Sequence, residues 1–315
     1  MLALSEVWAK KYVDEVALRE QRLRQRRLQR AKRDDVVQTL NGKLRSVSVQ
    51  AWQKTESLLN HEIERHGIAS DLIDPWRISK DIYQIFDKAI TAYANNLPPA
   101  RLSVMVAKDI GAIRQHHTAI DPRVIGFVIM QFHYSGELLV KGVAQPEVAK
   151  LQQYFKVVDD HLHMPLQRAY DAAATYSYDS RRLKTVQALL PNCTAIARSI
   201  VRRINQLYPH YSSYSGRLDS KTVQIASVRD VEMFQIYLWT CVLEQNISAI
   251  ARELFPLCVM LYPTFKVNWE LVRQMINLME QALARCVTAE QIKYYQPYHR
   301  ALWHMFSPEV FPETL

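Results

Sequence analysis

The sequence predicts an all-α protein. Only 7 of its 315 residues are glycine, against an apolar content of 49%, and it shows none of the alternating Val- and Thr-rich runs that indicate strands. Apolar residues instead recur three or four positions apart along most of the chain, which is the spacing of amphipathic helices. The length exceeds that of a usual single domain, so we expect more than one helical region.

Residues 1–45 are predicted to form a basic helical arm. They hold twelve Lys or Arg and six Asp or Glu, and therefore +6 of the formal net charge of +9. Residues 4–40 contain neither Gly nor Pro, which favours a helix. The leucines between residues 18 and 28 follow no helical face, which indicates a solvated helix. We expect Asn41-Gly42 to end it.

The arm is a predicted docking site for an acidic partner. Its proposed partner-binding residues are Arg22, Arg24, Arg26, Arg27, Arg30, Lys32 and Arg33. The partner could be an acidic protein surface, an anionic membrane or nucleic acid; the plain alternative is a solvated extension without a specific role. Nucleic acid is disfavoured because no aromatic residue interleaves the arginines. A membrane is disfavoured because no apolar stripe lies opposite the charges.

Residues 46–145 are expected to form a compact helical module. Helical spacing resumes over 43–66, and Pro-containing breaks then separate helices at about 78–95, 99–118 and 122–142. Two histidine clusters of this region, His116-His117 and the stretch around His133, show no HExxH or similar metal spacing. We expect ordinary surface or hydrogen-bonded core histidines there.

Residues 146–315 form the last predicted domain. Helices are expected over 147–163, from Pro165, near 182–207, through Val223–Val242 and directly after it, near Val267 and from Thr288. Thr288 with Gln291 has the pattern of a capping box. Asp159 and His163 are four residues apart on one helix face, so an i,i+4 hydrogen bond or ion pair explains them without a catalytic or metal site.

In order and spacing, the helices of residues 147–306 resemble the phycobiliprotein family, the globin-like light-harvesting subunits of cyanobacteria and red algae. The family carries Cys-x-Arg-Asp on its central helix, and Arg229-Asp230 keep the Arg-Asp pair in register. The loop 210–216 and the helix start Val267–Leu271 continue the likeness. The resemblance implies a globin-like, phycobiliprotein-type domain, in which the aspartate accepts hydrogen bonds from bilin pyrrole nitrogens and the arginine engages a propionate.

Ser227 stands at the position of the family's bilin-attaching cysteine. A hydroxyl of ordinary, very high pKa does not add to a bilin as a thiolate does, so we expect no thioether-linked chromophore. Arg229 and Asp230 are then remnants of the family's site, which either bind a bilin non-covalently or form a structural pair. The four cysteines, Cys193, Cys241, Cys258 and Cys286, have no CxxC spacing and are expected to be buried free thiols in a reducing cytosol.

These features predict a phycobilisome-type protein without a covalent chromophore that binds other proteins, as an adaptor, assembly factor or regulator of the antenna. No catalytic series, phosphate loop or metal spacing appears, so we expect no enzymatic activity and no cofactor. The alternatives are a sensor of a free bilin or other apolar anion, and a bilin lyase or isomerase. With no apolar run of roughly 18–20 residues and no signal peptide, we expect the cytoplasm, including the cytoplasmic face of the thylakoid membrane.

Overall fold

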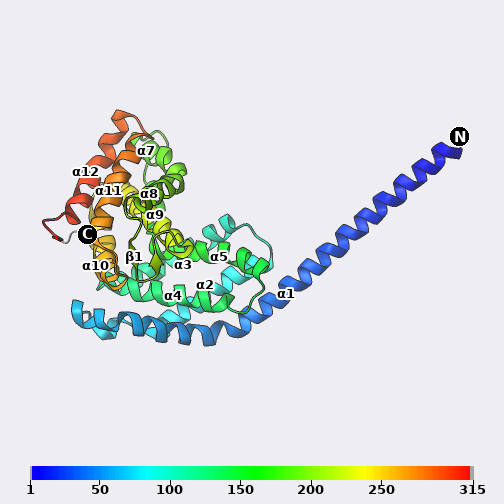
Figure 1. Cartoon of the computed structure of the whole chain (residues 1–315), viewed down its shortest axis with the longest axis horizontal. Helices are drawn as coiled ribbons and strands as arrows, with labels where there is room; N and C mark the ends of the chain where they lie inside the picture. The colour runs from blue at the N-terminus through cyan, green and yellow to red at the C-terminus, as the bar shows by residue number, and fades with distance from the viewer. Residues whose placement is uncertain (1, 313–315) are drawn as a thin grey trace.

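A long helix carries a body built from shorter helices (Figure 1). The computed structural model describes residues 2–312, which are mostly helical apart from loops and one hairpin of two-residue strands. The all-α prediction is therefore confirmed. The first helix, α1 (Leu2–His66), leaves the body at its amino-terminal end, and its carboxy-terminal half lies along the body.

The predicted helix end at Asn41-Gly42 is wrong, because α1 continues through it to His66. Its apolar residues Leu40, Leu44 and Val47 are almost fully buried, against α2 and α4. Burying three such side chains contributes several times the roughly 1 kcal/mol that glycine costs inside a helix. The helix ends instead at Gly67, where φ is +60° and the Ile68 amide donates to the Ile63 carbonyl at 2.9 Å.

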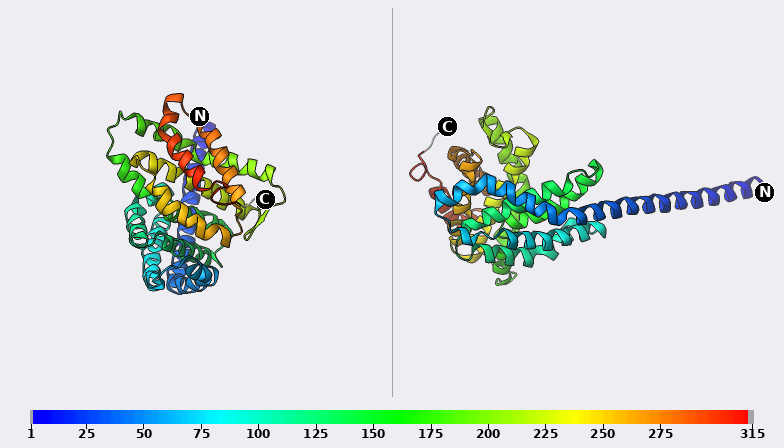
Figure 2. Two further views of the ribbon diagram at one scale, coloured as in Figure 1. Left: turned by 90° about the vertical axis from the view of Figure 1, so that its left-hand side faces the viewer. Right: turned by 90° about the horizontal axis from the view of Figure 1, so that it is seen from below.

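The arm proper is the segment of α1, residues 3–32, that extends away from the body. Residues 3–32 are exposed throughout, and the right-hand view of Figure 2 shows this segment extending clear of the other helices. At 1.5 Å per residue it reaches about 45 Å from the body. Arg33 forms its base, since it donates to Asn96 Oδ1 at 3.0 Å and stacks over the Tyr93 ring.

The helical module packs on the second half of α1. It consists of η1 (Ser70–Leu72), α2 (Pro75–Ala94), α3 (Pro99–Thr118), η2 (Pro122–Val124) and α4 (Ile125–Val140). Helix α4 is the buried one, because all residues from Ile125 to Phe132 are shielded from solvent. Asp74 caps α2 by accepting from the Trp76 and Arg77 amides, as a residue before Pro at the first helical position does.

The remaining helices surround α9 (Lys221–Glu244), which is buried at every position from Val231 to Leu243. They are α5 (Gln145–His163), α6 (Leu166–Ala174), α7 (Arg181–Leu189), η3 (Leu190–Asn192), α8 (Cys193–Leu207), the π-helix η4 (Ile250–Leu254), α10 (Phe255–Thr264), α11 (Trp269–Ala284) and α12 (Ala289–Met305). The capping box at Thr288 and Gln291 is confirmed.

The single helix predicted near 182–207 is wrong. A 3₁₀ turn at Leu190–Asn192 divides it into α7 and α8, because Pro191 lacks the amide hydrogen that a continuing α-helix needs. The hairpin of β1 (Ser212–Ser213) and β2 (Gly216–Arg217) then leads into α9, with Ser212 opposite Arg217. Tyr214 ties this hairpin to the body, since its amide donates to the Phe265 carbonyl at 2.9 Å.

One hydrophobic core runs through the body from α1 to α12. Helix α5 links its two parts, since it packs on α2, α3 and α4 as well as on α9. The predicted boundary near residue 145 lies in the turn before α5, where Gly142 has φ +86°. The helical module and the carboxy-terminal helices are thus joined by shared packing.

Candidate binding cleft

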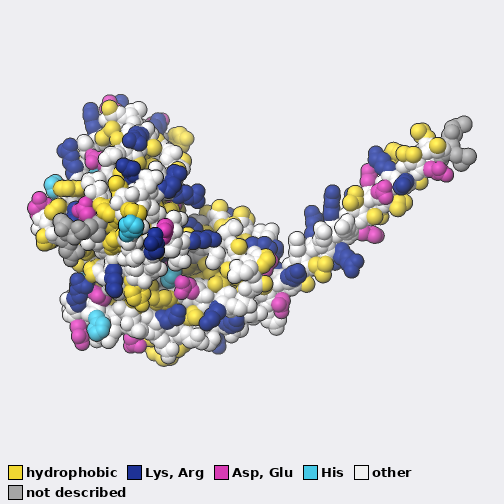
Figure 3. Space-filling model, in the orientation of Figure 1, with side chains coloured by type: hydrophobic (Ala, Val, Ile, Leu, Met, Phe, Trp, Pro, Cys, Tyr) yellow, Lys and Arg dark blue, Asp and Glu magenta, His cyan; other side chains and the backbone are white. Residues whose placement is uncertain are grey.

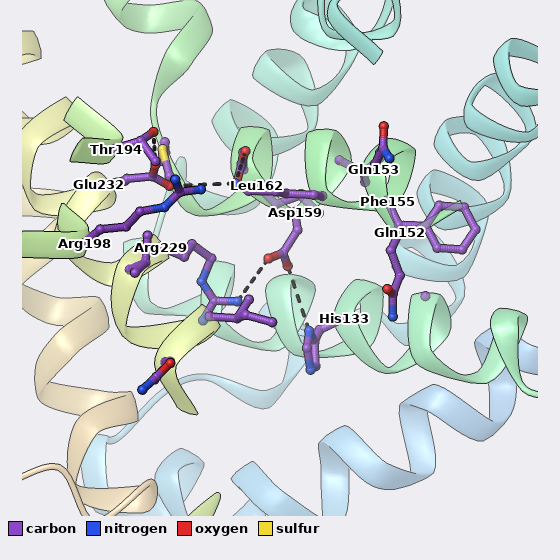
Figure 4. A pocket seen from close by; sticks show the side chains of 18 of the residues that line it. His133, Gln152, Gln153, Phe155, Asp159, Leu162, Thr194, Arg198, Arg229 and Glu232 are labelled. Carbon is purple, nitrogen blue, oxygen red and sulfur yellow. Dashed lines mark hydrogen bonds and ion pairs between the residues drawn. The ribbon is translucent and has the colours of Figure 1, made fainter. Parts of the chain in front are cut away.

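An open cleft of about 1400 Å³ lies where α4 and α5 face α8 and α9 (Figure 4). Its floor is apolar and includes Val158, Leu162 and Val201. Charged side chains surround that floor: His133, Glu137, Lys156, Asp159, Asp160, Arg198, Arg202, Lys221, Arg229 and Glu232. The cleft therefore combines an apolar surface with both signs of charge, as binding sites commonly do.

An ion pair between Arg229 and Asp159 spans the cleft. Arg229 Nη1 donates to Asp159 Oδ2 at 3.0 Å, and a weaker contact of 3.4 Å joins Nη2 to Asp230 Oδ1. His163 also contacts the main chain of Asp159, because its Nδ1–H donates to the Asp159 backbone carbonyl at 2.9 Å. His133 approaches Asp159 Oδ1 at 3.9 Å from α4, and Figure 4 shows it pointing to that carboxylate.

The electrostatics of this group keep Asp159 ionised. Burial raises the pKa of Asp159, but His163 and Arg229 lower it more, so the pKa lies well below its usual range. Burial, together with the Arg229 charge, lowers the pKa of His163 to about 3. At neutral pH the group is thus a carboxylate paired with a guanidinium beside a neutral imidazole.

The residues expected at the bilin site do not all face the cleft in the structure. On α9 the cleft wall within the described chain consists of Lys221, Gln224, Ile225, Val228, Arg229, Glu232 and Ile236. Arg229 therefore faces the cleft, whereas Ser227 and Asp230 do not belong to that wall. Asp230 lies near Tyr262 and Cys258, whose pKa values its charge helps to raise, and burial raises the pKa of Asp230 itself.

The i,i+4 contact expected between Asp159 and His163 is confirmed, with 3.4 Å between Nδ1 and Oδ1. Spacing alone gave no sign of Arg229 as the second partner of Asp159, because the two residues are 70 positions apart. A short-range pattern identifies contacts within one helix. It does not identify which distant helix faces that side chain.

A second charged group that lines the cleft involves Lys156, Asp160 and Glu232. Lys156 Nζ lies 2.6 Å from Asp160 Oδ2 and 3.7 Å from Glu232 Oε2, while Thr194 donates to Glu232 Oε1 at 2.5 Å. Burial raises the pKa of Asp160 to about 6, although Lys156 opposes the shift. Each acidic side chain here has a partner inside the protein.

No pattern in the sequence indicates the buried network that joins the helical module to the carboxy-terminal helices. Arg114 of α3 is 6% exposed and donates to the Tyr237 hydroxyl at 2.7 Å and to Glu253 Oε2 at 2.9 Å. Arg168 pairs with the other Glu253 oxygen and with Glu244 at 2.5 Å. Glu253 lies in η4, and π-helical turns often occur at functional positions.

The other candidate groups stay inside the fold. Cys193, Cys241 and Cys258 are buried and Cys286 is half-buried, all as free thiols. Burial raises the pKa of Cys193 to about 12 and that of Cys241 to about 11, which makes them poor nucleophiles. His117 is buried 3.0 Å from Asp81. Within residues 2–312 no cluster of three or more His, Cys, Asp or Glu residues could hold a metal ion.

The proposed partner-binding residues of the arm are separate from the cleft. Arg22, Arg24, Arg26, Arg27, Arg30 and Lys32 are exposed, and Figure 3 shows Lys and Arg side chains along the arm. Arg33, at the base, is instead half-buried and bonded to Asn96. In the described part of the chain, no helix has the length and hydrophobicity needed to cross a membrane.

Comparison with known proteins finds a family whose model matches the carboxy-terminal helices. Residues 153–304 match the model of a family described as Phycobilisome protein. This match begins within α5 and ends within α12, and so contains Ser227, Arg229 and Asp230. It confirms the resemblance and the globin-like, all-α fold class of this region. No curated protein and no solved structure matches the chain.

Proposed function

We propose, from the match of residues 153–304 to the phycobilisome protein family, that this antenna-related protein carries no covalent chromophore and works by binding other proteins. Its role is that of an adaptor, assembly factor or regulator of the light-harvesting antenna. The arm engages an acidic surface of an antenna protein, and the cytoplasmic face of the thylakoid membrane is the proposed location.

The observation that carries this proposal is the arm itself. Residues 19–33 contain eight Lys or Arg against one Glu, and all but Arg33 of these side chains stand exposed on the segment of α1 that extends away from the body. Keeping so many like charges close together costs free energy unless solvent or an opposite charge compensates it. An acidic protein surface supplies that charge and is attracted over about 8–10 Å at physiological salt.

The chemistry at residue 227 supports the absence of a covalent chromophore. Ser227 offers a hydroxyl in place of a thiol, and the cysteine closest to it along the chain, Cys241, lies buried more than three helical turns further on in α9. Burial also raises the pKa of Cys241 to about 11. Since the thiolate is the attacking species, neither residue is suited to form a thioether with a bilin.

The pairing of Arg229 supports a structural role for the Arg-Asp motif. Arg229 is held by Asp159 at 3.0 Å and by Asp230 at 3.4 Å, so two carboxylates already compensate its charge. A bilin propionate would have to displace one of them. One donor is left over, because the buried Nε of Arg229 has no hydrogen-bond partner within the described chain.

That unpartnered nitrogen and the open cleft favour a second candidate, a sensor that binds a free bilin or another apolar anion without a covalent bond. A visible spectrum separates the two candidates. With added biliverdin, an adaptor leaves the pigment's absorption unchanged, whereas a sensor shifts the absorption maximum and saturates at one equivalent. A bilin lyase or isomerase would instead convert the pigment or attach it to an antenna apoprotein.

The proposed function is tested by affinity capture from a phycobilisome-containing lysate with the tagged full-length chain. We expect antenna subunits to be enriched over a control in which Arg22, Arg24, Arg26, Arg27 and Arg30 are replaced by Gln. Antenna subunits captured equally by both baits would remove the arm from the proposal. Capture of none by the unaltered chain would contradict the proposed function.

A further inference from the structure

Three cations on one side of the cleft have no partner in the described chain. Arg198 and Arg202 lie one turn apart on α8, and Lys221 begins α9. All three are exposed and line the cleft (Figure 4 labels Arg198). Residues four apart on a helix present their side chains on the same face. Together these cations form a positive edge along the cleft.

The acidic residues of the cleft form no ion pair with this edge, because their partners in the described chain are other groups. Asp159 pairs with Arg229, Asp160 pairs with Lys156, and Glu232 accepts from Thr194. Glu137 lies on the α4 side, 3.5 Å from His133. The lining holds five Lys or Arg (Lys156, Arg198, Arg202, Lys221 and Arg229) against four Asp or Glu (Glu137, Asp159, Asp160 and Glu232), so its cations exceed its acids by one, and the unpaired cations are those of the positive edge.

Beside the positive edge, the cleft exposes large apolar side chains. Ile225 of α9 is 60% exposed and Leu190 of η3 is 48% exposed, and both line the cleft. Burying them against a partner would remove their apolar surface from water, which favours binding. Apolar residues next to unpaired cations match an amphipathic segment that presents apolar side chains flanked by carboxylates.

We propose that this cationic cleft, defined by Arg198, Arg202, Lys221, Leu190 and Ile225, docks an acidic amphipathic helix of a partner protein. The inference rests on the proposed function. It gives this protein a second contact with its partner, separate from the contact that the arm makes. The chain's own arm does not fit, since residues 19–33 carry eight cations and one anion. The volume of about 1400 Å³ exceeds the roughly 300–1,000 Å³ of usual small-molecule sites, which favours a peptide segment.

The test measures fluorescence anisotropy of a labelled 18-residue helical peptide titrated with the full-length protein. The peptide carries Leu at positions i, i+3, i+4 and i+7 and Glu at the flanking positions. We expect saturable binding that weakens at least tenfold in the R198Q/R202Q/K221Q variant. A peptide with Lys in place of Glu should not bind. Ile225→Glu should weaken binding of the Glu peptide separately, because it removes an apolar contact and adds repulsion.

A matched control removes the same charge elsewhere. Arg203, Arg285 and Lys293 are exposed cations that do not line the cleft, so R203Q/R285Q/K293Q should bind the peptide like the unaltered chain. Circular dichroism of each variant should match the unaltered chain, since only exposed side chains change. Equal weakening in both triple variants would show a general charge effect and overturn the proposal.

Two further results would also overturn it. If the arm variant with five Gln loses the peptide, then the arm and not the cleft binds it. If biliverdin binds and R198Q/R202Q/K221Q abolishes that binding, the cleft holds a small apolar anion. Should the chain capture antenna subunits through its arm but ignore the acidic peptide, this inference alone fails and the proposed function stands.

Discussion

Arg229 of α9 and Asp159 of α5 form an ion pair with 3.0 Å between Nη1 and Oδ2, and their side chains are only 20% and 23% exposed. The pair joins α9, the central helix of the region that matches the phycobilisome family, to α5, which packs on the amino-terminal module. The arginine that the family resemblance assigns to a bilin propionate thus has an internal partner.

Replacing Arg229 by Gln is expected to lower the free energy of unfolding by about 3 kcal/mol, because it leaves Asp159 partly buried without its counter-ion. Urea unfolding followed by circular dichroism measures this. Arg217→Gln serves as the control, since its pair with Asp219 is exposed on both sides and should change stability little.

The double variant R229Q/D159N distinguishes a pair from two independent effects. We expect its loss of unfolding free energy to be smaller than the sum of the losses in the two single variants. With both side chains neutral, no charge is left without its counter-ion. Additive losses would mean that the two side chains act separately, and that the pairing contributes nothing to stability.

Glu253→Gln should destabilise the protein by about 3 kcal/mol or more. Glu253 accepts from Arg114 and pairs with Arg168. Its loss therefore removes a negative charge that compensates two guanidinium groups where α3 meets η4. The midpoint of urea unfolding reports the loss. Glu290→Gln, at a side chain 64% exposed, should leave that midpoint nearly unchanged; a similar fall in both variants would contradict a special role for Glu253.

Stability should fall as the pH drops from about 6.5 to 4. Burial lowers the pKa of His161 to about 4 and that of His163 to about 3, whereas in the unfolded chain both histidines bind a proton near pH 6.5. In that window the unfolded state holds more protons, so each histidine reduces the free energy of unfolding by about 1 kcal/mol per pH unit. Urea midpoints at several pH values measure the slope.

The variant H161Q/H163Q checks the origin of this pH dependence. Neither Gln titrates, so the slope between pH 6.5 and 4 should flatten in the variant even where its absolute stability is lower. An unchanged slope would assign the acid sensitivity to other groups.

The sequence predicts contacts that lie within one helix and misses those that join distant helices. Asp159 with His163 and Thr288 with Gln291 follow from spacing and are present. Arg114 and Glu253 are 139 positions apart, and no periodicity indicates that α3 and η4 meet. The cleft could not be predicted for the same reason, since it depends on how α5 lies against α8 and α9.

Two local predictions failed for physical reasons. Asn41-Gly42 has the composition of a helix end, but Leu40 and Leu44 on either side of it are buried by tertiary packing that the local sequence does not show. Pro191 breaks the helix predicted near 182–207, and there the local chemistry prevailed over the apolar periodicity.

The central claim is that the arm recruits an acidic antenna partner, so R22Q/R24Q/R26Q/R27Q/R30Q should bind it more weakly. Exposed pairs at roughly 0.3 kcal/mol each give about 1.5 kcal/mol for five, or about tenfold in Kd. Helical content should not change, because these side chains contact nothing in the body. The control removes five exposed cations from the body: Arg101, Lys108, Arg203, Arg285 and Lys293.

The most direct measurement is the Kd of the full-length chain for purified phycobilisomes at low and physiological salt, for the unaltered, arm-variant and control proteins. We expect tight binding that weakens with salt, about tenfold weaker binding by the arm variant, and little change in the control. Equal affinity of the unaltered chain and the arm variant, or no binding by either, would contradict the claim.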